Sequence, residues 1–314
     1  MSRVPTQLCL IVTLLAVAGC GGSGPAGSDD GGRLRVVATT TIVGDLVRTI
    51  GGDDLRLETL MGAGVDPHLY KPSAGDVRTM ADAEVVVYNG LHLEGKMTDV
   101  LEEMSGRGVE TVAVGSCLPA EELLPVAGFD NLHDPHIWFD VTLWQQAAIC
   151  LRDELMRLDP DHAEGHRTRG DATIAELTAL DSWVRGRIAT IPEQRRVLVT
   201  AHDAFSYFGR AYGVEVRGLL GVSTASEAGT SDVQQLARFI ADRGLPAVFV
   251  ESSVPPRFVE ALVEAVTARG GDVSIGGSLY SDALGSPGGP AATYVGTVRS
   301  NVDTFVDAMV GGPE

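Results

Sequence analysis

Short apolar runs alternate with amphipathic segments along most of this chain. Between residues 34 and 158, β-rich runs at 34–39, 55–61, 84–88 and 109–114 are separated by helix-favouring segments at 42–50, 73–82, after residue 94 and at 141–158. A second series follows Pro192, with runs at 196–201, 214–216, 247–250 and 273–275 and helical segments near 205–211, 232–243, 256–268 and 291–310. Strand, helix and strand in this order predict parallel βαβ units, and hence an α/β fold with two Rossmann-like lobes.

One long helical segment joins the two series. Asp159 and Pro160 form a helix-start signal, and neither a proline nor a strand pattern interrupts the chain before about residue 191. At about 1.5 Å per residue the helix would be about 45 Å long. We therefore predict a rigid linking helix at 159–191 between an N-terminal lobe at 33–158 and a C-terminal lobe at 192–314. Such a helix favours small lobe adjustments over wide hinge closure.

The first residues have the pattern of a removable targeting peptide. One basic residue, Arg3, precedes an apolar run at 8–18 that is shorter than the roughly 20 residues of a spanning helix. The sequence Val-Ala-Gly-Cys ending at Cys20 resembles the lipobox of bacterial lipoproteins, so we predict a signal peptide at 1–19 and lipidation of Cys20. An ordinary secretory signal cut nearby is the alternative. Residues 20–32 are rich in Gly and Ser and would tether a folded extracytoplasmic body to the membrane.

Charge and cysteine content narrow the classes of function. The chain carries 42 acidic against 24 basic residues, a formal net charge of -18, which disfavours binding to a nucleic acid backbone. Cys117 and Cys150 are the two cysteines left after the signal peptide and Cys20. An oxidising compartment permits them to pair, and two buried free thiols are the alternative.

Histidines follow several of the predicted strands, where parallel sheets place their ligand-binding loops. His68 and His136 each stand in an Asp-Pro-His sequence, His202 ends the run at 196–201, and Asp282 follows the run at 273–275. Three imidazoles and one carboxylate would suit Zn²⁺ or Mn²⁺. Their wide spacing matches no local metal motif, and histidines on loops are commonly hydrogen-bonded or solvated instead.

Five segments taken in order are similar to the metal-binding solute-binding proteins of ABC transporters, the cluster A-I or cluster 9 family of TroA-like zinc and manganese receptors. They are VDPHLYKPSAGDV at 65–77, YNGLHLEG at 88–95, DPHIWFDV at 134–141, VTAHDAFSYFGRAYG at 199–213 and SLYSDALG at 278–285. The resemblance implies that His68, His136, His202 and Asp282 coordinate the metal. It also implies two α/β lobes joined by a backbone helix, with the metal in the cleft between them.

Two departures from the family bear on the metal. Residues 115–131 contain Glu121 and Glu122 but no histidine, unlike the His-rich loop of many zinc-specific relatives. Manganese-specific relatives commonly have Glu where this chain has His202, and a third imidazole favours Zn²⁺ by ligand type. The resemblance leaves Zn²⁺ and Mn²⁺ open, with Fe²⁺ disfavoured.

Other polar residues near these segments have different expected roles. His133 ranks second to His136 as a ligand, and His92 is expected at the surface or at the rim of the cleft. Asp140, Asp203 or Glu251 could orient an imidazole, although capping or surface charge is the simpler role for the two aspartates. The pair His162 and His166 lacks the order of a metalloprotease motif, so we predict a solvated helix face there.

We interpret the chain as a monomeric, lipid-anchored receptor that captures a divalent metal and delivers it to an ABC permease. Four protein ligands leave no open position for an activated water, which argues against an enzyme. Two alternatives come from other classes: a secreted zinc hydrolase, for which neither a nucleophile elbow nor H-E-x-x-H is present, and an adhesin-type lipoprotein.

Overall fold

The computed structural model describes Met1 and residues 32–129, 131–226 and 228–311. The predicted signal peptide after Met1, the lipidation site Cys20 and the tether up to residue 31 lie outside these residues. No helix in the described ranges is long and apolar enough to cross a bilayer. The strands and helices in these ranges belong to the body from residue 33 onward.

The N-terminal part of the body is built on one parallel sheet. Its strands are β1 (Leu34–Ala38), β2 (Leu55–Thr59), β3 (Val85–Tyr88) and β4 (Glu110–Ala113), in the order β2-β1-β3-β4. The helices that connect them are α1 (Thr41–Gly51), α2 (Ala74–Asp82) and α3 (Thr98–Gly106). The predicted βαβ order is therefore confirmed here, with element ends shifted by a few residues.

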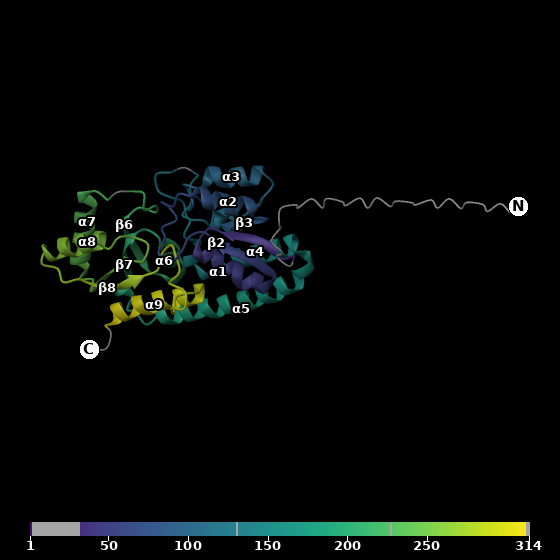
Figure 1. The fold of residues 1–314 in the computed structure, drawn as a ribbon. Coiled ribbons are helices and arrows are strands. Elements are labelled where there is room, and N and C mark those ends of the chain that lie inside the picture. Colours follow the sequence, from purple (N-terminus) through teal and green to yellow (C-terminus); the bar gives the residue numbers. More distant parts are fainter. Residues whose placement is uncertain (2–31, 130, 227, 312–314) are drawn as a thin grey trace. The chain divides into compact units, whose positions relative to one another are not determined.

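The C-terminal part contains two parallel strand pairs. β5 (Val197–His202) pairs with β6 (Glu215–Leu220), and β7 (Ala247–Glu251) pairs with β8 (Ser274–Leu279). The helices of this part are α6 (Ser206–Tyr212), α7 (Thr230–Arg243), α8 (Arg257–Thr267) and α9 (Tyr294–Val310). β5 also lies beside β7, so the ends of these strands approach one another. Both parts have the predicted α/β architecture (Figure 1).

Two long helices connect these parts. α4 (Val141–Leu158) has the predicted bounds, and it begins at Asp140, whose side chain accepts hydrogen bonds from the backbone N–H groups of the first turn. A 3-10 turn at Pro160–His162 then precedes α5 (Ala163–Ile188), which is about 39 Å long at 1.5 Å per residue. The linking helix is thus shorter than the predicted 159–191, because Pro160 starts a separate turn.

The hydrophobic core explains why α5 is helical. Its buried positions recur every three or four residues, including Leu177, Leu180, Val184 and Ile188, and they face α1, α4 and α9. The largest buried cluster joins residues of both halves of the body, from Val36 to Met309. Smaller clusters lie under α2 and α3 and under α7 and α8. This arrangement is consistent with two lobes, while the predicted boundaries at 158 and 192 stay predictions.

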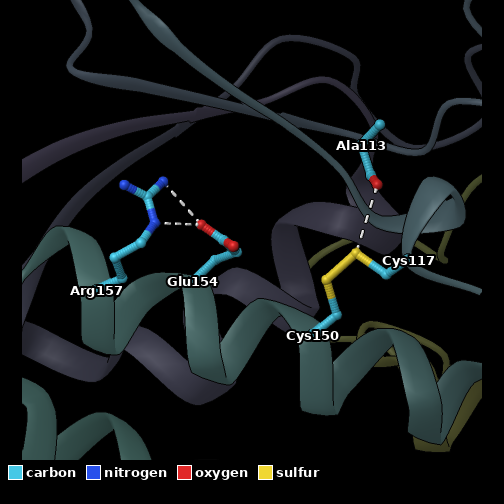
Figure 2. Close-up of a disulfide and its surroundings, with 5 residues drawn as sticks. All are labelled: Ala113, Cys117, Cys150, Glu154 and Arg157. Atoms are coloured by element: carbon cyan, nitrogen blue, oxygen red, sulfur yellow. Dashed lines mark hydrogen bonds and ion pairs between the residues drawn. A yellow bond between two sulfur atoms is a disulfide. The ribbon is translucent and has the colours of Figure 1, made fainter.

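A disulfide links the end of the first sheet to α4. Cys117 ends the 3-10 helix Val114–Cys117 that follows β4, and Cys150 lies in α4, with the two Cα atoms 6.2 Å apart (Figure 2). Of the two alternatives for these cysteines, the structure therefore contains the bonded pair. The bond closes a segment that includes His136 and the α4 cap Asp140, and so ties both ends of that segment to the same helix.

Candidate metal centre

Four side chains predicted to be metal ligands meet in the structure. His68, His136, His202 and Asp282 each offer one ligand atom, and these atoms lie within 4.8 Å of one another. They come from the loop after β2, the 3-10 turn before α4, the end of β5 and the loop after β8. All four residues are buried, with His68 the most exposed at 6%. Residues separated widely in the sequence thus form one compact group.

The three imidazoles face the same point through their Nε2 atoms. His136 Nε2 lies 3.3 Å from His68 Nε2 and 3.3 Å from His202 Nε2. The Asp282 carboxylate completes the group, with Oδ1 3.4 Å from His136 Nε2 and Oδ2 3.4 Å from His202 Nε2. A Zn–N bond of about 2.05 Å places two ligands of a tetrahedral shell about 3.3 Å apart. The spacing therefore fits one small cation at the centre.

Asp282 supplies a second sign that the site is built for a ligand. Its Oδ1 is buried and makes no hydrogen bond within the described part of the chain, despite the nearby imidazole. An unpaired buried carboxylate oxygen is costly, and coordination of a cation would compensate for this cost. Its Oδ2 lies 3.4 Å from the Ser253 hydroxyl, which holds the carboxylate from the other side.

Local turns orient His68 and His136 in the same way. In each Asp-Pro-His sequence the aspartate Oδ1 accepts the backbone N–H of the histidine, from His68 to Asp66 at 2.9 Å and from His136 to Asp134 at 2.9 Å. Such side-chain turns are characteristic of aspartate two residues before the donor. Both turns present the imidazole to the ligand group.

Buried carboxylates also determine which ring nitrogen of His136 and of His202 is available to bind a metal. Asp134 Oδ1 lies 2.6 Å from His136 Nδ1, and Glu251 Oε2 lies 2.5 Å from His202 Nδ1. A carboxylate only accepts, so each Nδ1 carries the proton and donates it. When the rings are neutral, both Nε2 atoms present a lone pair to the centre, the usual carboxylate–histidine–metal arrangement.

The position of His202 depends on close packing of two strands. Glu251, at the end of β7, also accepts the backbone N–H of His202 through Oε1 at 2.8 Å. Gly218 in β6 faces the backbone just after His202, and a Cβ there would lie 2.4 Å from Asp203 N. Only glycine permits this approach, so β6 can pass directly against the turn that carries the imidazole.

Opposed charges and burial shift the pKa values within the group. Burial lowers the pKa of His68 to about 3. Burial also opposes a charge on His136, but Asp134 and Asp282 outweigh it and raise the pKa of that imidazole to about 9. Against the same burial, Glu251 and Asp282 raise the pKa of His202 well above its usual range. Burial disfavours the Asp282 carboxylate, yet His202 and His136 hold its pKa well below normal.

Of the three acidic residues that could orient an imidazole, the structure places one against a ligand and two elsewhere. Glu251 orients His202, whereas Asp140 caps α4 and Asp203 accepts from the Ser206 hydroxyl at 2.8 Å. Asp66 and Asp134 were missed by the sequence analysis, although the repeated Asp-Pro-His pattern could have indicated them.

Two of the remaining histidines lie outside the ligand group. His133 is half-buried and pairs with Pro125 in an isolated bridge, and so is not among the four converging residues. His92 is exposed in a turn with a positive φ of 64°, as expected of a rim residue.

The predicted solvated face of α5 is wrong for His166. This residue is fully buried, and its Nε2 lies 2.8 Å from Asp159 Oδ2 while Arg169 donates to its Nδ1 at 3.1 Å. Arg169 also donates to the carbonyl oxygens of Ile50 and Gly51, at the end of α1. The beginning of α5 therefore packs against α1, and the polar spacing reflects a buried network. His162, which contacts Asp159 at 2.9 Å, is partly exposed.

The chain is similar to several characterised metal receptors. The family described as ZnuA, zinc-uptake complex component A, periplasmic, matches residues 36–308. The zinc-binding protein TroA of Treponema pallidum is 48% identical over 92% of both chains, and the manganese-binding lipoprotein MntA of Bacillus subtilis is 44% identical over 98% of this chain and 99% of its own. The solved structure of the Treponema pallidum protein superposes with a TM-score of 0.86, covering 88% of this chain and 99% of the other. The chain therefore belongs to the ZnuA family, and it is a TroA-like solute-binding protein of the kind that serves ABC transporters of zinc and manganese.

Proposed function

We propose that this protein captures a divalent transition metal, Zn²⁺ or Mn²⁺, outside the cytoplasmic membrane and delivers it to the permease of an ABC importer. The observation that carries the proposal is the convergence of three Nε2 atoms and one carboxylate at the spacing of a metal coordination shell. In this proposal His68, His136, His202 and Asp282 are the ligands, and the metal is cargo rather than a resident cofactor.

The donor set favours Zn²⁺ as the cargo. Three imidazoles and one carboxylate match the nitrogen and oxygen ligands of tetrahedral zinc, whereas Mn²⁺ prefers more oxygen ligands. The named relatives include both a zinc-binding and a manganese-binding protein, so the comparison leaves both metals as candidates. A direct competition between the two ions would decide between them.

We infer that the protein binds its metal without turnover. Four buried side chains fill a tetrahedral shell, and a hydrolase would need a position for water and substrate. The hydrolase alternative predicts cleavage of ester or peptide substrates by the metal-loaded protein, lost on chelation. The receptor predicts stoichiometric binding with no cleavage.

We also propose that the mature protein is a monomer anchored through a lipid on Cys20. The support is the lipobox-like sequence that ends at this cysteine and the glycine-rich segment after it. Metabolic labelling with a fatty acid should mark the wild-type protein in cells but leave Cys20→Ala unlabelled. Equal labelling of the two would contradict the anchor.

The ligand assignment is tested by metal titration of the purified body. Wild-type protein should bind one Zn²⁺ per chain by elemental analysis and hold it against a chromophoric chelator. His68→Ala and Asp282→Ala should weaken binding by at least about a hundred-fold, because each removes a ligand of the shell. His162→Ala is the matched control, since this histidine is partly exposed and contacts Asp159 outside the ligand group, and it should bind as wild type. Unchanged affinity in both ligand variants would reject the assignment.

A further inference from the structure

A groove lies beside the candidate metal centre, and one of the four proposed ligands lines it. This groove of about 760 Å³ has walls that include Leu124, Phe129 and Pro135, from the segment before α4, and Val222 and Ser223, from the loop after β6. Among the four proposed ligands, only His68 lines this groove in the described residues. An ion that enters by this groove must therefore pass His68 to reach the other three ligands, or the groove walls must separate.

A hydrogen bond joins the loop of His68 to one wall of this groove. The Thr224 hydroxyl, in the loop after β6, donates to Asp66 Oδ2 at 2.6 Å, across 158 residues of sequence. The other oxygen of the same carboxylate accepts the backbone N–H of His68 at 2.9 Å. Asp66 thus holds the ligand loop with one oxygen and the groove wall with the other.

The two loops belong to different halves of the body. Asp66 follows β2 in the N-terminal sheet, whereas Thr224 follows β6. A second close approach lies nearby, where a Cβ on Gly64 would lie 3.4 Å from the carbonyl oxygen of Ser252, just beyond β7. The loop of His68 is therefore packed against elements of the C-terminal part on one side and hydrogen-bonded to them at Thr224.

We propose that the Thr224–Asp66 hydrogen bond is a latch that sets the rates of metal binding and release. This inference rests on the proposed function and deepens it, because it assigns positioning residues to the same site. The Thr224 hydroxyl bonds to Asp66, which is not one of the four proposed ligands. Its loss should make the groove open more often without changing the ligand set, so the metal should enter and leave faster by similar factors.

The expected size of the effect follows from the chemistry of the bond. A hydrogen bond to a charged acceptor in a partly buried place contributes enough free energy to change an equilibrium constant about ten-fold. Here the equilibrium is that between the closed and the open groove. Thr224→Val keeps the shape of the side chain and removes the hydroxyl. We expect about ten-fold faster Zn²⁺ release and about ten-fold faster binding, with an equilibrium affinity within about three-fold of wild type.

Stopped-flow measurement of Zn²⁺ release into excess chelator, and of Zn²⁺ binding to metal-free protein, tests this latch. Thr224→Ser retains a hydroxyl and should restore wild-type rates. Thr230→Val, the same substitution at an exposed position at the start of α7, is the matched control and should leave both rates unchanged. The absorption spectrum of Co²⁺-loaded Thr224→Val should match wild type, because the four ligands remain.

The outcomes separate the latch from the proposed function itself. Rates in Thr224→Val within two-fold of wild type, or a Thr224→Ser variant as fast as Thr224→Val, would overturn the latch. A variant that loses affinity and changes its Co²⁺ spectrum would instead place Thr224 among residues that shape the ligand set, and would also overturn it. Failure of the wild-type protein to bind a stoichiometric metal would reject the proposed function, independently of any variant at Thr224.

Discussion

Glu251 offers the sharpest test of the residues that orient the proposed metal ligands. It is buried at the end of β7 and makes two contacts with one residue, accepting the His202 backbone N–H at 2.8 Å and facing its Nδ1 at 2.5 Å. One contact places the histidine backbone and the other orients the ring. Removing the carboxylate should therefore weaken metal binding without removing a ligand.

The magnitude follows from these two contacts. Loss of a residue that orients a metal-bound imidazole typically costs about 10- to 100-fold in affinity, which corresponds to about 1.4 to 2.8 kcal/mol. Glu251→Gln offers one oxygen and one amide N–H₂, so only one of the two contacts survives and a donor faces the other. We expect about ten-fold weaker Zn²⁺ binding for Glu251→Gln and about a hundred-fold for Glu251→Ala.

Folding and metal affinity have to be measured separately, because a buried N–H left without an acceptor costs about 1 to 3 kcal/mol of stability. Urea unfolding of the metal-free variants measures the first quantity, and competition with a chromophoric chelator at pH 7.5 measures the second. Glu260→Gln, the same substitution at an exposed position in α8, is the matched control. If folded Glu251→Ala binds Zn²⁺ within two-fold of wild type, the carboxylate does not support the site.

Three further predictions concern pH, the disulfide and the buried histidine. Because His136 has a pKa raised to about 9 and His202 a pKa raised well above normal, both imidazoles are protonated in the metal-free protein below these values, and Zn²⁺ must displace the protons. Zn²⁺ affinity should therefore fall by more than ten-fold per unit as pH drops from 8 to 6 in competition titrations, and a flat profile would contradict the assignment. The double variant Cys117→Ser with Cys150→Ser should lose about 3 to 4 kcal/mol of unfolding free energy in urea, because the bond closes a loop with a separation of 33 residues; equal stability of oxidised and reduced wild-type protein would argue against it. His166→Ala should destabilise the metal-free protein by about 2 kcal/mol, since it removes one buried hydrogen-bond partner from Asp159 and one from Arg169. The partly exposed His162→Ala should cost less in the same urea titration.

Hydrophobic periodicity was sufficient to predict most elements of the body. The bounds of α4 match the predicted segment, and α5 lies within the helical segment predicted at 159–191. The prediction for His166 was wrong. Its polar side chain suggested exposure, but the C-terminal end of α1 packs against this part of α5 and buries it. A single helical segment cannot show which of its polar residues have partners from elsewhere in the fold.

The ligand group also shows which features the sequence could predict and which it could not. His68, His136, His202 and Asp282 were identifiable as a set through a resemblance, but their spacing along the chain matches no local pattern. Asp66 and Asp134 act two residues from their histidines, so the repeated Asp-Pro-His sequence contained that information. Glu251, 49 residues from His202, could only be nominated from its position at a strand end.

By itself the sequence determined the order of strands and helices, the acidic surface charge and the residue types available for a metal, because periodicity and composition act locally along the chain. Only the tertiary structure decided that three Nε2 atoms lie at the spacing of ligands around one metal ion, that Glu251 and Asp134 orient two of the rings, and that Thr224 reaches Asp66. These contacts join residues from separate strands and loops, and their distances depend on how the strand ends pack together rather than on any spacing in the chain.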